Sequence, residues 1–265
     1  MENRRSTSRP SHVLARQPSK GLVAILTTLV ILVACAQETK AAAIAVPNFS
    51  FESQSGVGQP FGVNINIDSW QKNSKPGYFI DSAQLQWIQT AGAFVDTNPY
   101  GNHDGTQAAY LLSFPGAGLF QDLTSPDAKF TIGMSYNMSL GVFSKDMTAG
   151  NTLSLSLYYR DGLNNFVTVG APTTVTYSAA GFPNLGPLNL IDFSVNLGEV
   201  QAGDAWAGKN IGIKIEIGVS DFSGKNWDFD NVRLTATPVP EPTSMALLAL
   251  GFGGFLAVRM RSRKR

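Results

Sequence analysis

The feature that most constrains this chain is a strict alternation of apolar and other residues. In residues 211–219 every odd position is Ile or Val, and Gly212, Lys214, Glu216 and Gly218 occupy the even positions. A period of two puts the branched side chains on one face of a strand, where a second layer can bury them. The segment therefore predicts a strand with one face in a core.

Other segments repeat this pattern. Residues 152–170 alternate Leu with Ser, continue through Asp161-Gly162 and end in a second apolar run, which predicts a hairpin that turns near the Asp-Gly pair. No segment between residues 44 and 238 has a helical apolar stripe, and clusters of Gly, Pro, Asn and Asp separate the apolar segments. This order predicts an all-β fold, an antiparallel β-sandwich or jelly roll. Further strands are predicted at residues 61–67, 84–89, 106–112, 118–123, 129–142, 173–177 and 191–197.

Near the end of this region, the apolar phase slips by one residue. Apolar side chains occupy odd positions up to Phe229 and even positions from Val232 onward. A β-bulge produces such a slip, because it inserts one extra residue into a strand and turns the following side chains to the opposite face. The pattern predicts a bulge at residues 230–231.

The chain begins with the pattern of a secretory signal peptide. A leader with four Arg and one Lys precedes a thirteen-residue apolar run at 21–33, and small residues follow. Residues 1–43 therefore predict a signal helix, with cleavage after residue 36 or after residue 43. Residues 32–35 also resemble the lipobox of bacterial lipoproteins, in which Cys35 would become a lipidated N-terminus. The alternative is that Cys35 is an apolar residue of a discarded leader.

The chain ends with three features in a fixed order. A proline-rich motif comes first, then a fourteen-residue apolar run at 245–258, and then a basic cluster. As a helix the apolar run would be about 21 Å long, which is short for a membrane core of roughly 30 Å, and the basic cluster resists translocation. The segment predicts a short transmembrane helix. The motif is Val239, Pro240, Glu241 and Pro242, and the cluster is Arg259, Arg261, Arg263, Lys264 and Arg265.

These residues resemble the PEP-CTERM tail of exported bacterial proteins, which would make residues 238–265 a sorting signal. The resemblance implies export through the inner membrane and recognition of the tail by an exosortase-type membrane protease. It also implies transient or anchored insertion in the membrane, followed by delivery to the cell envelope or an extracellular exopolysaccharide matrix. Residues 44–237 are then the exported domain.

The composition of residues 44–238 narrows the choice of partners. Sixteen acidic residues outnumber nine basic ones, which gives a net charge of −7. An acidic domain disfavours nucleic acid and anionic lipid and suits divalent cations or neutral sugars. The chain has a single cysteine, Cys35, so no disulfide can stabilise the domain. A hydrophobic core or a bound ion must stabilise it instead.

Short motifs of the exported domain resemble the galactose-binding-like jelly roll of carbohydrate-binding modules. They lie in order at residues 48–52, 105–111, 118–123 and 230–234, and Trp70 belongs with them. The resemblance implies that the first and last strands are neighbours and that a structural calcium lies where Glu52 and Asp230 meet. Calcium prefers hard oxygen ligands such as carboxylates. The alternative is that Glu52 is a solvated loop acid and that Asp230 binds backbone amides at the bulge.

In such modules, exposed aromatic rings stack on sugar rings. Trp87 and Trp227 have strand neighbours and are predicted to be core residues, whereas Trp206 lies among small residues from which a ring could project. Tyr100 lies in a loop rich in Asn and Asp. We expect Trp206 and Tyr100 to form the ligand platform of a glycan-binding domain. The alternative is that both rings fold back and cap the sandwich.

No motif identifies a catalytic residue. His103, beside Asp104, is the one histidine of the domain and is predicted to be a solvated turn residue. Glycoside hydrolysis needs two carboxylates at a suitable separation, and nothing selects a pair among the acids. The sequence predicts an exported protein that binds polysaccharide or exopolysaccharide without catalysis. A structural matrix protein with no specific ligand and a glycan-active hydrolase or lyase are the alternatives.

Overall fold

The computed structural model describes residues 40–53, 63–95, 100–145, 147–183, 188–239 and 251. The chain divides into two compact units, Met1–Glu38 and Thr39–Arg265, and every described residue belongs to the second. The predicted signal helix and the apolar run at 245–258 lie outside the described residues, apart from position 251. Within the described part of the chain, no helix is both long and apolar enough to cross a membrane.

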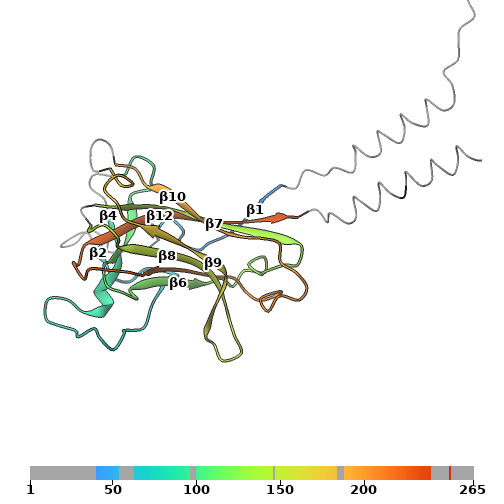
Figure 1. Ribbon diagram of the computed structural model, residues 1–265, viewed down its shortest axis with the longest axis horizontal. Coiled ribbons are helices and arrows are strands. Elements are labelled where there is room, and N and C mark those ends of the chain that lie inside the picture. Colours follow the sequence, from blue (N-terminus) through green and yellow to red (C-terminus); the bar gives the residue numbers. More distant parts are fainter. Residues whose placement is uncertain are drawn as a thin grey trace, which may run out of the picture. The chain divides into compact units, whose positions relative to one another are not determined.

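Two antiparallel sheets form the domain, as predicted (Figure 1). The larger sheet has the order β10-β7-β12-β5-β4-β2, with β1 also paired to β12, and the smaller has the order β3-β6-β11-β8-β9. The larger sheet contains β1 (Ala42–Ile44), β2 (Val63–Asn64), β4 (Ala91–Val95), β5 (Gln107–Leu112), β7 (Met134–Ser144), β10 (Ile191–Leu197) and β12 (Asn226–Pro238). The smaller contains β3 (Gln71–Lys72), β6 (Gly118–Asp122), β8 (Thr152–Arg160), β9 (Phe166–Thr176) and β11 (Gly212–Ile217).

The core lies between the sheets and is filled by the alternating residues. In β11 the side chains of Ile213, Ile215 and Ile217 are buried, while Lys214 and Glu216 point to the other face, where they form an ion pair of 2.9 Å. Burying each isoleucine contributes roughly 1.5–3 kcal/mol. Trp87 and Trp227 are buried too, which confirms their prediction as core residues.

Two of the predicted strands are wrong or nearly lost, whereas the one predicted at 129–142 begins only at Met134 and the one predicted at 173–177 is the end of β9. Residues 84–89 do not form a strand, because the chain enters a short 3-10 helix, η1 (Trp87–Thr90), in which Gln86 and Gln89 form a capping box. The predicted strand at 61–67 is reduced, within the described residues, to the two residues of β2. In both places a nearby side chain accepts a backbone amide that a strand would have paired with a neighbouring strand. The Gln86 amide donates to the Gln89 side chain, and the Asn66 amide donates to the Asn64 side chain.

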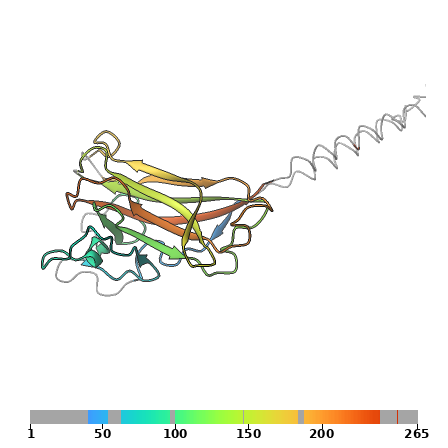
Figure 2. The same ribbon diagram turned by 60° about the horizontal axis from the view of Figure 1, so that its bottom comes forward.

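The β12 strand contains the predicted bulge and brings the two ends of the domain together. Its register with β7 shifts between Asp230 and Arg233. Near its end Ala236 pairs with Ala42 of β1, and the Val239 amide donates to the Gly133 carbonyl at 2.8 Å. The chain therefore enters and leaves the sandwich at one end, while the loop between β3 and η1 lies at the opposite end (Figure 2).

The outer face of the smaller sheet provides a test of the packing. A Cβ on Gly212 would lie 2.2 Å from Cζ of Tyr158, and the Tyr158 hydroxyl donates to Asp122 at 2.8 Å, so the ring cannot swing away freely. We expect Gly212→Ala to lower the free energy of unfolding by about 1–3 kcal/mol, measured by urea denaturation. Gly198→Ala is the matched control, because a Cβ there meets nothing within 4 Å. Equal stability of the two variants would contradict this packing.

Candidate functional site

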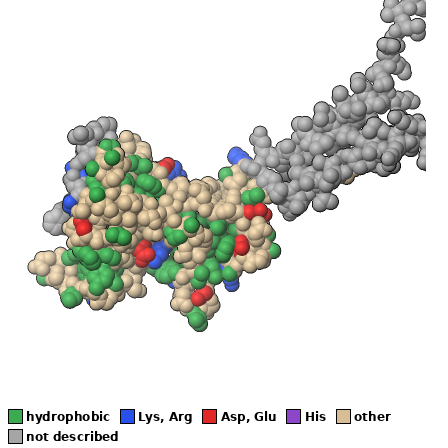
Figure 3. Space-filling model, in the orientation of Figure 1, with side chains coloured by type: hydrophobic (Ala, Val, Ile, Leu, Met, Phe, Trp, Pro, Cys, Tyr) green, Lys and Arg blue, Asp and Glu red, His purple; other side chains and the backbone are tan. Residues whose placement is uncertain are grey.

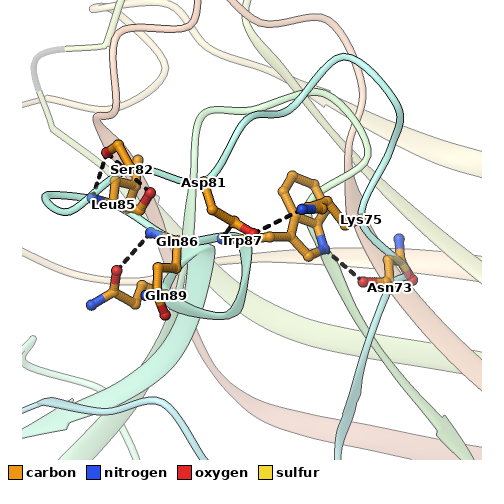
Figure 4. A network of polar contacts seen from close by, with 8 residues as sticks. All are labelled: Asn73, Lys75, Asp81, Ser82, Leu85, Gln86, Trp87 and Gln89. Carbon is orange, nitrogen blue, oxygen red and sulfur yellow. Dashed lines mark hydrogen bonds and ion pairs between the residues drawn. The ribbon is translucent and has the colours of Figure 1, made fainter.

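A polar network holds the loop between β3 and η1 in one conformation (Figure 4). The Asp81 carboxylate accepts a hydrogen bond from the Trp87 amide at 2.7 Å and pairs with Lys75 at 2.8 Å. The Trp87 indole donates to the Asn73 carbonyl at 2.8 Å. The hydrogen bond from Lys75, followed by that from the Trp87 amide, lowers the pKa of Asp81. The loop is therefore ordered by its own contacts.

Buried polar residues hold a second loop, between β11 and β12. Ser113 and Asn151 are buried, and the Asn151 side-chain oxygen accepts from the Asp221 amide at 2.9 Å. The Ser220 hydroxyl donates to the Ser113 carbonyl and accepts from the Phe222 amide at 3.0 Å. Phe222 has φ of 58°, a left-handed conformation that costs a non-glycine residue on the order of 1 kcal/mol. The network thus maintains a strained backbone that turns an aromatic ring outward.

The two loops together form an exposed aromatic platform, defined here as Tyr78, Ile80 and Phe222. Their exposed fractions are 47%, 85% and 55%. The Tyr78 and Phe222 rings are nearly perpendicular, with centroids 5.7 Å apart, and Phe114 beneath them lines a shallow pocket of about 260 Å³. Hydrophobic side chains gather over the β3–η1 loop in Figure 3.

A groove of about 460 Å³ lies beside η1. Ile67, Trp70, Trp87 and Ile88 form its apolar wall, and Asn66, Asp68 and Lys72 supply polar groups. Phe79, which lies beside Tyr78, packs edge-to-face on Trp87 at 5.0 Å. One buried aromatic pair therefore supports both the groove and the platform.

The structure brings Glu52 and Asp230 to the same loop. The Glu52 carboxylate accepts from the Thr106 amide at 2.7 Å and also from the Gln107 amide, whereas Asp230 Oδ2 accepts from the Asp104 amide at 2.7 Å. Both acids thus bind amides of residues 104–107. The alternative in the sequence analysis was that Asp230 binds backbone amides, and it does. The same alternative made Glu52 a solvated acid, but Glu52 also accepts hydrogen bonds from backbone amides.

The environment of Asp230 fits a cation in one respect. Its Oδ1 atom is buried with no hydrogen-bond partner, and burial raises the pKa of Asp230 to about 7. A buried carboxylate oxygen without a partner is unfavourable, and a calcium ion would supply the missing positive charge. In the described part of the chain, however, no three His, Cys, Asp or Glu side chains gather into a group that could hold a metal ion. Further ligands would have to be carbonyl groups or water.

The predicted ligand residues lie in different surroundings. Tyr100 is buried, its ring packs on Phe143 at 5.0 Å and its hydroxyl donates to Asp228 at 2.5 Å, which corrects the expectation of an exposed ring. Trp206 is half-buried against the core, and its indole nitrogen is buried with no partner. His103 also differs from the prediction of a solvated residue, because its Nε2 is buried and unpartnered.

Sequence reasoning missed the platform residues. Tyr78 and Ile80 lie between Pro76-Gly77 and Asp81-Ser82, and Phe222 lies between Ser, Asp and Gly residues. An apolar residue among turn formers is the signal that selected Trp206, and it would also have selected these residues. The groove gives no such signal, because Trp70 and Trp87 have the ordinary pattern of core residues.

The domain is a jelly-roll-like β-sandwich. Comparisons with known proteins identify the C-terminal tail. A family model of the PEP-CTERM protein-sorting motif matches residues 238–264. The chain therefore ends in a PEP-CTERM sorting motif, which indicates an exported protein processed at the membrane. Comparison with curated proteins gives no match.

Several solved structures resemble the sandwich. A cyclase from Fischerella sp. TAU is 20% identical, with a TM-score of 0.56, and the match covers 76% of this chain and 100% of that one. The Stig cyclase Fisc from the same organism, bound to an indole compound, is 21% identical, with a TM-score of 0.55. The match again covers 76% of this chain and 100% of that one. The CBM22-1 xylan-binding domain of Paenibacillus barcinonensis Xyn10C is 14% identical, with a TM-score of 0.40 and coverage of 78% and 100%. The cyclase likeness shows the fold alone.

Asp230 gives a prediction for the pH dependence of stability. Because burial raises the pKa of Asp230 from its ordinary value near 4 to about 7, the folded state binds a proton that the unfolded state has lost. Stability should therefore fall as pH rises from about 4 to about 7 and then level off. Each pH unit in this range lowers the free energy of unfolding by about 1.4 kcal/mol, so the total decrease between pH 4 and pH 7 is roughly 4 kcal/mol.

We expect Asp230→Asn to abolish this decline and to raise the Tm at pH 8 in the presence of a chelator, as measured by thermal denaturation. Asp127→Asn, on an exposed loop residue, is the control and should follow the parent protein. An Asp230→Asn variant that loses stability equally at pH 5 and pH 8 would contradict the burial of an ionisable carboxylate.

Proposed function

We propose that this exported protein binds polysaccharide without catalysis, through the aromatic platform. The observation that carries the proposal is a pair of exposed aromatic rings on two loops, each of which is held by a polar network. Aromatic faces attract the C–H faces of sugar rings, and a rigid platform loses little entropy when a ligand binds. The strained backbone at Phe222 supports a binding role, because strain is commonly retained at functional positions.

The place of the platform supports a ligand outside the membrane. Phe222 precedes the first residue of β12, and the sorting motif follows the last. A strand of thirteen residues spans about 40 Å. While the tail is in the membrane, the platform is therefore far from the point where the chain leaves the domain, which favours a matrix glycan over lipid as its ligand.

We also propose a structural calcium ion at the Glu52–Asp230 site. Asp230 would hold the ion through Oδ1. Glu52 would contribute its carboxylate, which contacts the same loop at residues 104–107 as Asp230 does. The bound ion would neutralise a buried negative charge and fix the loop at residues 104–107 against β12. This role is structural and does not depend on the platform.

The platform can be tested by affinity electrophoresis of the full chain in detergent through gels containing soluble xylan, galactan, glucan or bacterial exopolysaccharide. We expect Phe222→Ala to weaken retention about tenfold, since one stacked ring is worth roughly 1.4 kcal/mol. Ile80→Ala should weaken retention less, because it removes only aliphatic contact area. Leu163→Ala is the matched control for Ile80→Ala, because both side chains are 85% exposed.

Three other outcomes would overturn this proposal. Retention that is lost in Trp206→Ala but kept in Phe222→Ala would move the binding site to the Trp206 loop. A folded protein that no polysaccharide retains would leave the structural matrix protein as the better description, and release of reducing ends would establish a glycan-active enzyme.

Calcium binding can be tested by thermal denaturation with calcium and with a chelator. We expect calcium to raise the Tm more at pH 8 than at pH 5, because protons compete for Asp230. Asp230→Asn should remove the effect of calcium, whereas Asp127→Asn should preserve it. A calcium effect that survives in Asp230→Asn would place the ion elsewhere.

A further inference from the structure

Lys72 lies at the edge of the smaller sheet and has unusual partners. It is half-buried in the groove beside η1, and its ammonium donates to the carbonyl of Ile88 and to that of Ala91 at 2.6 Å. Among the described residues, no carboxylate forms an ion pair with it, although Lys75 and Lys214 each have one. Within the described structure, the hydrogen-bond partners of the Lys72 ammonium are therefore two backbone carbonyls and no carboxylate.

A half-buried ammonium without a counter-ion favours a bound anion, because charged groups removed from water are stabilised by an opposite charge. The ammonium has three N–H donors, and two are used by the carbonyls of Ile88 and Ala91. One donor remains for a ligand. The groove also offers an apolar wall at Trp87 and Ile88 and the polar side chains of Asn66 and Asp68.

We propose that this groove binds a single carboxylated sugar residue, with the carboxylate on Lys72 and the sugar ring against Trp87 and Ile88. The inference rests on the proposed function, which it extends by naming a uronic acid as the ligand of a second site. The volume of about 460 Å³ is in the range of small-molecule sites. Asn66 and Asp68 are the side chains that would bind the sugar hydroxyls.

The charge of the domain limits the ligand further. A net charge of −7 over residues 44–238 repels a polyanion, and Asp68 at the groove repels a second carboxylate. The expected ligand is therefore a mostly neutral glycan with occasional uronic acid residues, rather than a polyuronate. A neutral glycan that crosses the platform could place one such residue in the groove.

The protonation state of Lys72 gives this site a distinct pH dependence. Burial lowers the pKa of Lys72 to about 8, so the ammonium that would bind a carboxylate is lost as pH rises through 8. Asp68 is the other titratable group among the groove residues, and η1 contributes none. Carboxylate binding should therefore weaken between pH 7 and pH 9, whereas stacking of a neutral sugar should not change.

The test compares two sugars that differ at one carbon. NMR titration of the full chain in detergent at pH 6.5 with methyl glucuronoside and with methyl glucoside, and with the corresponding galacto pair, measures the preference for a carboxylate. We expect at least one uronoside to bind about tenfold more tightly than its neutral partner, as a charge-assisted hydrogen bond allows. The preference should vanish at pH 9.5.

Variants of Lys72 separate recognition from support of the fold. Lys72→Gln should lose the preference for the uronoside, and Lys72→Arg should keep it at pH 9.5, because guanidinium stays protonated. Lys129→Gln, which changes an exposed lysine without an ion pair in the described structure, should behave as the parent protein. A Lys72→Gln variant that weakens both sugars equally would show a structural role and overturn the inference.

Two further outcomes would also overturn it. If neither uronoside binds at pH 6.5, or if the preference is unchanged at pH 9.5, Lys72 does not bind the carboxylate. Neither result affects the platform, because retention of neutral polysaccharide by Phe222 is measured separately. Loss of retention in Phe222→Ala with an intact uronoside preference would confirm two independent sites.

Discussion

The pairing of β12 is the interaction on which the rest of the structure depends. It pairs with β5 at its beginning, with β7 over most of its length and with β1 near its end. The bulge between Asp230 and Arg233 lets both halves bury their apolar residues, because without it Val232 and Leu234 would face solvent. The buried Asp230 carboxylate lies at the start of this bulge, beside residues 104–107, so the proposed ion site lies next to the bulge.

The strands could be predicted because their signal is local. Side chains that alternate along residues 211–219 or 152–160 determine which face is buried, whatever strand lies alongside. Even the bulge is visible, because it reverses the phase between Phe229 and Val232. The η1 segment could not be predicted in this way. Its conformation depends on the Gln86–Gln89 capping box and on Asp81, which accepts the Trp87 amide, and these contacts leave no periodic pattern.

The candidate site was predictable only in part. The likeness to a jelly roll led to Glu52 and Asp230, which the structure does bring to one loop. The platform is different, because Tyr78 and Phe222 are far apart in sequence and are in contact only in the folded domain. Burial of Ser113 and Asn151, which hold the Phe222 loop, is a property of the packed domain and has no signature in the chain. Tyr100 shows the converse error, since a polar loop can still bury its aromatic ring.

The direction of β12 connects the two ends of the molecule mechanically. Phe222 of the platform lies four residues before β12, and the sorting motif begins at the end of β12, so a glycan held at the platform and a tail held in the membrane would pull along the strand axis. The ladder bonds between β12 and β7 run across that axis, and a pull along the strand loads them together rather than one after another. Since β12 also pairs with β5 and β1, the strand bears the load from both sides. A central last strand is therefore suited to joining a surface ligand to a membrane tail.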